Sequence, residues 1–324
     1  MPVNVFFAFA DAGNYSSPLV SSPQRGGEGM DFRLMADDRR DTSATGPATL
    51  AALRRRIDEI DDALHDLLMR RAALVEEVAA VKRVDDQVPF RPGREAQIVR
   101  RLVGRHRGTF PRAALVRLWR EILGATVAMQ GELTVAVAPG CWDLARDHFG
   151  TLAPMALVDP DEAMLAVAEG RAVVGVLPLD DDSGEPWWLR LSALAPRPRV
   201  IARLPFGVLG NAAPDCQDAF VVAAMEPEAS GSDCTLLTVA ASDALDTALL
   251  VDALHDARLA ANPVAAAAHG GGCAHLVEIE TLLDDGDGAV GAALAPLGAL
   301  AVTWLGAYAR PLPDRAMGII APVS

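Results

Sequence analysis

The feature that most constrains the fold is a long stretch without helix breakers. Residues 49–88 contain neither proline nor glycine, and their apolar residues recur with alternating spacings of four and three, the pattern of a helix with one apolar stripe. A helix of about 35 residues is roughly 50 Å long, so a small monomeric domain cannot bury the whole stripe. We therefore expect a partner helix, most simply from a second copy of the chain. The stripe consists of Leu53, Ile57, Ile60, Leu64, Leu67, Leu74, Val78 and Val81.

Two shorter helices are predicted next, because prolines and glycines interrupt the pattern at residues 89–93 and 108–111. The second helix is expected over residues 94–107 and the third over residues 111–130. The stripe of the second helix is Glu95, Ile98, Val99 and Leu102. One face of the third helix is Leu115, Trp119, Ile122, Thr126 and Met129.

The rest of the chain divides into segments of different character. Residues 1–48 are rich in Ser, Gly, Asp and Pro and predict a disordered leader. Strand-like and helix-like pieces alternate in residues 132–228, which predicts an α/β unit with a parallel sheet. Residues 233–311 follow the β-α-β-β-α-β order of a ferredoxin-like fold, and residues 312–324 form a tail. With a helical domain at 49–131, the predicted architecture is multidomain: all-α, then α/β, then α+β.

Composition and charge exclude several function classes. No apolar run is long enough to span a bilayer and the N-terminus lacks the basic leader of a signal peptide, so we expect a cytoplasmic protein without membrane contact. Four scattered cysteines suggest free thiols rather than a metal site. The net charge is −14, with a basic balance only in residues 50–130, which disfavours nucleic acid and favours a small anion. Lys82 is the single lysine beside 28 arginines; it either meets a need for a compact charge or is a chance survival.

Three cations lie on or beside the stripe of the first predicted helix. Arg71 is on the stripe, and Lys82 follows it by eleven residues, close to three turns, so a small dianion can bridge both side chains. Arg54 lies 28 residues from Lys82, about 42 Å along one helix. One ligand can therefore contact both only if an antiparallel partner helix brings Arg54. This spacing predicts a site shared between subunits, although a lone Arg at a seam usually extends to solvent.

Three further polar residues lie on the other two predicted helices. Glu95 opens the stripe of the second helix, and Thr126 and Gln130 lie one turn apart on the third. Each also has an ordinary structural interpretation: a Glu in a first turn usually interacts with the helix N-terminus, and a Gln at a helix end usually faces water. Their occurrence together with the three cations favours a binding site.

The segment from Leu50 to Gln130 resembles the all-helical chorismate mutases, including the mutase portion of bifunctional mutase–prephenate dehydratase proteins. The match is carried by the motifs LRRRIDEIDDALHDLLMRRAALVEEVAAVK, VPFRPGREAQIVRRL and LWREILGATVAMQ. The resemblance implies an intertwined helical homodimer that converts chorismate to prephenate without a cofactor or metal. It therefore predicts a function in the biosynthesis of phenylalanine and tyrosine.

The resemblance also implies a role for each polar residue. Arg71 would bind a substrate carboxylate, and Arg54 would reach the substrate from the other subunit. Lys82 and Gln130 would hydrogen-bond the ether oxygen, and Glu95 would contact the ring hydroxyl. We hypothesise that Glu95 has a raised pKa and acts as a donor. Thr126 stands where the family often has Ser near a carboxylate. Arg91 departs from the family pattern, because some members have an Asp there that reaches the hydroxyl; both residues stay in the predicted substrate-binding set.

The chemistry of the rearrangement suits these residue types. The reaction is unimolecular and needs no nucleophile. Two cationic clamps on two carboxylates hold chorismate in its compact form by orientation. The breaking C–O bond leaves negative charge on the ether oxygen, and a cation and an amide donor aimed there stabilise the transition state more than the ground state.

The C-terminal half resembles the dehydratase and ACT regions of the bifunctional proteins more weakly. GVLPLDDDSG has three aspartates, residues 180–182, where the dehydratase loop has Glu-Asn-Ser/Thr, and CQDAFVVA has Asp218 and Ala219 where that family has an essential Thr-Arg pair. The segment between these motifs is also too short for a second lobe. We therefore expect a mutase with a truncated dehydratase-like region and an ACT-like domain. The alternatives are a working mutase–dehydratase and a non-enzymatic amino-acid sensor on a dead mutase scaffold.

Overall fold

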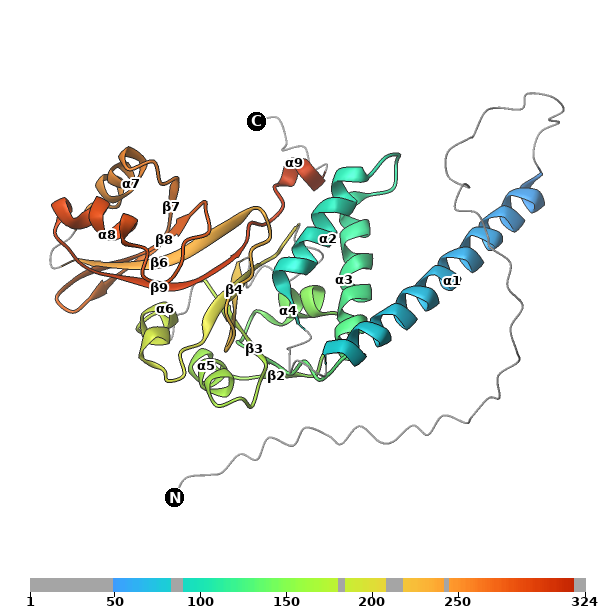
Figure 1. Cartoon of the computed structure of the whole chain (residues 1–324), viewed down its shortest axis with the longest axis horizontal. Helices are drawn as coiled ribbons and strands as arrows, with labels where there is room; N and C mark the ends of the chain where they lie inside the picture. Colours follow the sequence, from blue (N-terminus) through green and yellow to red (C-terminus); the bar gives the residue numbers. More distant parts are fainter. Residues whose placement is uncertain (1–48, 83–89, 180–183, 208–217, 242–244, 318–324) are drawn as a thin grey trace, which may run out of the picture. The chain divides into compact units, whose positions relative to one another are not determined.

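The computed structural model describes residues 49–82, 90–179, 184–207, 218–241 and 245–317 (Figure 1). The predicted leader and the three aspartates at 180–182 lie outside these ranges. The chain forms two compact units, residues 1–72 and 73–324, so the boundary falls inside the first helix. None of the helices in the described ranges combines the length and the apolar character needed to cross a bilayer.

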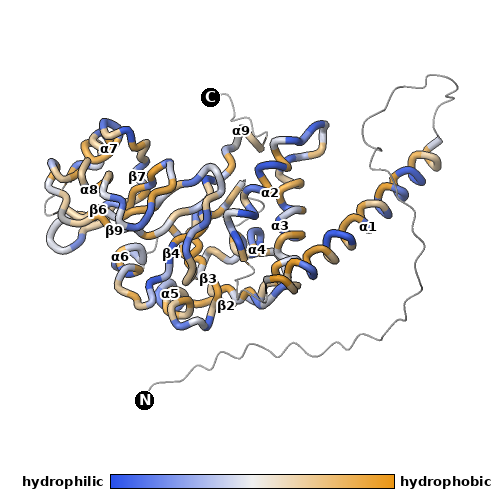
Figure 2. The backbone as a smooth tube through the Cα atoms, viewed as in Figure 1, coloured by the Kyte–Doolittle hydropathy of each residue, from blue (hydrophilic) through white to orange (hydrophobic). Residues whose placement is uncertain are grey.

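The first helix, α1 (Leu50–Lys82), has 33 residues and confirms the long helix expected from the pattern. Polar and apolar residues alternate along it in Figure 2. All eight residues of the predicted stripe are exposed in this single chain, from 43% at Leu53 to 67% at Val81. The stripe is thus uncovered among the described residues, and a partner helix that covers it stays a prediction.

The next two helices, α2 (Pro92–Arg105) and α3 (Arg112–Ala128), pack against each other. Pro92 suits the start of α2 because the first turn leaves its backbone N–H groups unbonded. The buried face of α3 lies beside the predicted one and shares Thr126 with it; its residues are Val116, Arg120, Leu123, Thr126 and Val127. Since α3 carries apolar residues on more than one side, its periodicity could not identify the side that the α/β region covers.

The α/β region begins with three parallel strands. β1 (Val135–Val137) lies between β2 (Met155–Leu157) and β3 (Val174–Pro178), as the alternating pattern predicted. Two antiparallel pairings follow, because β5 (Ala219–Ala223) pairs with both β3 and β4 (Arg199–Leu204). Helix α4 (Trp142–Phe149) packs on one face of these strands, and α5 (Pro160–Ala168) and the short α6 (Trp187–Arg190) pack on the other. A 3-10 turn, η1 (Leu191–Ala193), follows α6.

Residues 233–309 follow the predicted β-α-β-β-α-β order. The strands β6 (Asp233–Ala241), β7 (Ala261–His269), β8 (Gly272–Ile279) and β9 (Ala299–Ala309) are antiparallel in the order β9-β6-β8-β7. The helices α7 (Thr247–Asp256) and α8 (Gly288–Leu294) lie on the same face of these strands (Figure 1). A 3-10 turn, η2 (Ala295–Leu297), precedes β9, and α9 (Asp314–Met317) follows it.

The α/β strands and the β6–β9 strands form one sheet, which has nine strands among the described residues. The junction is a parallel contact between β4 and β9, with Val200 opposite Gly306. A Cβ at Gly306 would come within 2.2 Å of the Val200 carbonyl oxygen, and the φ of Gly306 is +146°. Only glycine fits this conformation and this close approach, so Gly306 is required where the two halves of the sheet meet.

Candidate active site

The centre of the second unit's helical part is a buried ion pair between α2 and α3. Glu95, in the first turn of α2, accepts a hydrogen bond from Arg120 Nη1 at 3.0 Å. Both side chains are below 10% exposed. Glu95 is thus a carboxyl group held in place between two helices, as a substrate-contacting acid requires.

Burial alters the protonation of this pair. It raises the pKa of Glu95 to about 7, although the positive charge of Arg120 opposes the shift. Burial also lowers the pKa of the Arg120 guanidinium, against the opposing effect of Glu95. The raised pKa of Glu95 agrees with the hypothesis made from its place on an apolar stripe. Near neutral pH this carboxyl therefore has access to both its donor and its acceptor form.

Sequence reasoning missed two residues of this cluster, Arg120 and His148. The ring of Phe206, beyond β4, lies 4.9 Å from the Arg120 guanidinium carbon. His148 of α4 is buried, and its Nε2 has no hydrogen-bond partner among the described residues. Burial and the charge of Arg120 lower the pKa of His148 well below its usual range. Arg120 had a signal in the sequence, because it continues the four-three spacing of Val116, Arg120 and Leu123.

Thr126 and Gln130 lie together at the end of α3, as their spacing predicted. The Thr126 hydroxyl is buried and donates to the Leu123 carbonyl at 2.8 Å. Gln130 Nε2 donates to the Thr126 carbonyl at 2.9 Å. Gln130 Oε1 is buried and finds no hydrogen-bond partner in the described part of the chain. A buried acceptor without a hydrogen bond costs free energy, and a bound ligand could supply the missing donor.

The basic residues of the predicted site lie in three different parts of the chain. Arg54 and Arg71 belong to the part of α1 in the first unit, where Arg54 is exposed and partial burial lowers the pKa of Arg71. Lys82 is the last residue of α1, and its side chain lies outside the described part. Arg91 immediately precedes α2, and its Nε donates to Glu228 Oε1 at 2.6 Å. The structure therefore brings Thr126 and Gln130 together, whereas Arg91 pairs with a carboxylate of the α/β region.

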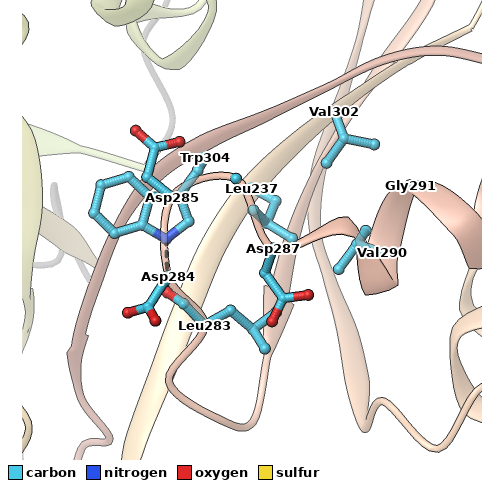
Figure 3. Close-up of a pocket in the computed structure, with 10 residues that line it drawn as sticks. Leu237, Leu283, Asp284, Asp285, Asp287, Val290, Gly291, Val302 and Trp304 are labelled. Atoms are coloured by element: carbon cyan, nitrogen blue, oxygen red, sulfur yellow. Dashed lines mark hydrogen bonds between the residues drawn. The ribbon is translucent and has the colours of Figure 1, made fainter.

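A separate cavity lies between the β6–β9 strands and the start of α8 (Figure 3). It has a volume of about 250 Å³, a floor that includes Leu237 and Val302, and a rim with Asp284, Asp285 and Asp287. Trp304 Nε1 donates to the Leu283 carbonyl at 3.1 Å and closes one side. An acidic rim repels an anion, so this cavity does not suit the dicarboxylate expected from the sequence.

Residues 53–131 match the family model described as chorismate mutase type II. This segment is therefore similar to the helical chorismate mutases, and the resemblance stated for residues 50–130 is confirmed. The match covers α2 with Glu95, α3 with Thr126, and Gln130 in the turn after α3.

Two relatives show the context in which such a domain occurs. Bifunctional chorismate mutase/prephenate dehydratases of Stutzerimonas stutzeri and Pseudomonas aeruginosa are each 34% identical over 146 residues, which is 41% of this chain and 40% of theirs. The chain thus spans about 40% of the length of these relatives. The similarity is longer than segment 53–131, so it is not confined to the mutase domain. The structure of a Streptococcus mutans prephenate dehydratase covers 55% of this chain and 98% of its own at 15% identity, but its TM-score of 0.39 is too low to support an inference.

Proposed function

We propose that this protein is a chorismate mutase that converts chorismate to prephenate in the biosynthesis of aromatic amino acids. The observation that carries the proposal is the match of residues 53–131 to the mutase family, with every polar residue of the expected set inside that segment. The buried Glu95 supports it through its raised pKa. Gln130 supports it because Nε2 uses one hydrogen on the Thr126 carbonyl and keeps a second to donate.

The proposed mechanism assigns a task to each side chain. Arg71 and Arg54 of the partner subunit bind the two carboxylates and hold chorismate in its compact form. Lys82 and Gln130 Nε2 donate to the ether oxygen as the C–O bond breaks, which stabilises the transition state more than the ground state. Glu95 binds the ring hydroxyl, and its raised pKa lets it donate in the protonated form. No cofactor or metal takes part in this scheme.

A homodimer completes the proposed site. The stripe of α1 exposes leucine, isoleucine and valine side chains over most of its length, and an exposed apolar surface of this kind marks an interaction site. An antiparallel second copy of α1 covers the stripe and carries Arg54 toward Lys82. The same association thus explains the stripe and the 28-residue separation of the two cations.

We propose that the C-terminal half has no dehydratase activity and serves the mutase structurally or as a regulatory region. Asp218 occupies the position where the dehydratases have Thr, and it forms an ion pair with Arg203 at 3.3 Å. Arg203 also pairs with the buried Glu278 at 3.0 Å. Both carboxylates would repel a dicarboxylate such as prephenate. The limits 49–131, 132–228 and 233–311 remain our proposal for the domains.

We also propose a cytoplasmic location. In the described part of the chain Cys141, Cys234 and Cys273 form no disulfide, and cysteines without disulfides are usual in a reducing compartment.

The test is to incubate the purified full-length protein with chorismate and to identify the products. Prephenate without phenylpyruvate supports the proposal, both products indicate a bifunctional enzyme, and no turnover indicates a sensor on an inactive scaffold. Lys82→Ala should lower kcat by at least about 100-fold, the loss seen when a transition-state donor is removed. Arg70→Ala, which removes an exposed cation elsewhere on α1, is the matched control and should leave kcat unchanged. Equal activity of both variants would refute the role of Lys82.

A further inference from the structure

We infer that Cys273 is a nucleophilic thiol, activated by His275, that forms a mixed disulfide with low-molecular-weight disulfides. Both residues belong to β8 and are two positions apart, so their side chains lie on the same face of the strand. The helix α7 lies on this face, and its first residue, Thr247, completes the group. This site is independent of the proposed mutase site.

The three side chains form a chain of hydrogen bonds. Cys273 Sγ lies 3.3 Å from His275 Nε2, and His275 Nδ1 lies 3.2 Å from the Thr247 hydroxyl. With its proton on Nδ1, the ring donates to Thr247 and accepts the thiol proton at Nε2. A nucleophile, a base within hydrogen-bond reach and a third group that orients the base are the parts of an activated nucleophile.

The sulfur also contacts the backbone that leads into α7. The backbone N–H of Leu245, just before α7, donates to Cys273 Sγ at 3.3 Å. Backbone donors at the start of a helix and an adjacent protonated His both stabilise a thiolate. His275 itself is only 3% exposed, so its geometry toward the sulfur is held by the packed core rather than by solvent.

Cys273 is also the most accessible of three cysteines in the described ranges that form no disulfide. It is partly exposed, whereas Cys141 and Cys234 are fully buried. Burial and, after it, the nearby Glu278 carboxylate raise the pKa of the Cys234 thiol to about 12. Cys234 is therefore an internal reference for an unreactive thiol in the same molecule.

The step is a thiol–disulfide exchange. His275 takes the proton from Cys273, and the thiolate attacks one sulfur of the incoming disulfide. A new S–S bond forms as the old one breaks, and the departing thiolate takes the proton back from His275. Cys273 is oxidised to the mixed disulfide, and half of the reagent is reduced to a free thiol.

The experiment uses 4,4′-dithiodipyridine, a neutral disulfide that releases a coloured thione. Cys216 lies outside the described residues, so the full-length chain carries Cys216→Ser, and peptide mass mapping assigns each modified site. We expect Cys273 to react first. His275→Gln should slow its modification by at least about tenfold, a conservative value for loss of a general base.

Two Thr247 variants separate activation from folding. Thr247→Val removes the hydroxyl that orients His275 and should slow the reaction severalfold, whereas Thr247→Ser retains the hydroxyl and should react like the parent. Near-ultraviolet circular dichroism checks that each variant is folded. The proposal is overturned if Cys273 reacts no faster than Cys234 in the native protein, or if His275→Gln and Thr247→Val both react at the parent rate.

Discussion

Gly124 offers the sharpest test of how the mutase helices join the rest of the chain. It lies in α3, where α4 ends against it, and a Cβ added there would approach the Phe149 carbonyl oxygen to 2.2 Å and the Phe149 carbonyl carbon to 3.0 Å. Both obstacles are backbone atoms, so a rotamer change cannot relieve the overlap. We predict that Gly124→Ala forces α3 and α4 apart and destabilises the second unit.

The magnitude follows from two opposing effects. Alanine in a helix interior gains about 1 kcal/mol over glycine, whereas inserting a methyl group into a packed contact costs about 1–3 kcal/mol and sometimes more. With backbone atoms this close, we expect a net loss of about 2 kcal/mol. For a unit of this size that loss lowers Tm by about 4–8 °C.

The measurement is thermal unfolding of the full chain, followed by circular dichroism, beside a matched control. Gly104 in α2 has nothing within 4 Å of an added Cβ, so Gly104→Ala should be neutral or slightly stabilising. A Gly124→Ala protein as stable as the Gly104→Ala protein would refute the packing of α4 on α3.

Two further predictions concern the site and the dimer. Because burial raises the pKa of Glu95 from 4.5 to about 7, the folded chain holds a proton that the unfolded chain releases, and stability should fall as pH rises through this window, by up to about 1.4 kcal/mol per pH unit. Glu95→Gln should flatten this slope in urea unfolding at pH 5, 6 and 7; an unchanged slope would contradict the assignment. Ile60→Asp places a charge on the α1 stripe and should yield a monomer in light scattering, whereas His65→Asp, on the same helix but off the stripe, should stay dimeric. A dimeric Ile60→Asp protein would argue against association through the stripe.

Much of the fold follows from local patterns in the sequence. The absence of proline and glycine over residues 49–88 predicted the long α1 helix, and α2 and α3 began within two residues of the expected positions. The β-α-β-β-α-β order of residues 233–309 was also predicted, because strand alternation and helical periodicity are properties of neighbouring residues.

The candidate site was only partly predictable. The sequence predicted three polar positions within apolar helical patterns: Glu95, Thr126 and Gln130. It did not predict their surroundings. Arg120 of α3 pairs with Glu95 of α2, and His148 comes from α4 in the α/β region. Neither contact has a fixed separation in sequence, so no periodicity can reveal it.

The sequence by itself determined the helices, the strands and the polar positions of this protein, because each depends on residues a few places apart. Only the tertiary structure decided which face of α3 is buried, that nine strands join into one sheet through Val200 and Gly306, and that Cys273 lies beside His275 and Thr247. These outcomes depend on which surfaces meet when distant segments pack, and on the desolvation that follows.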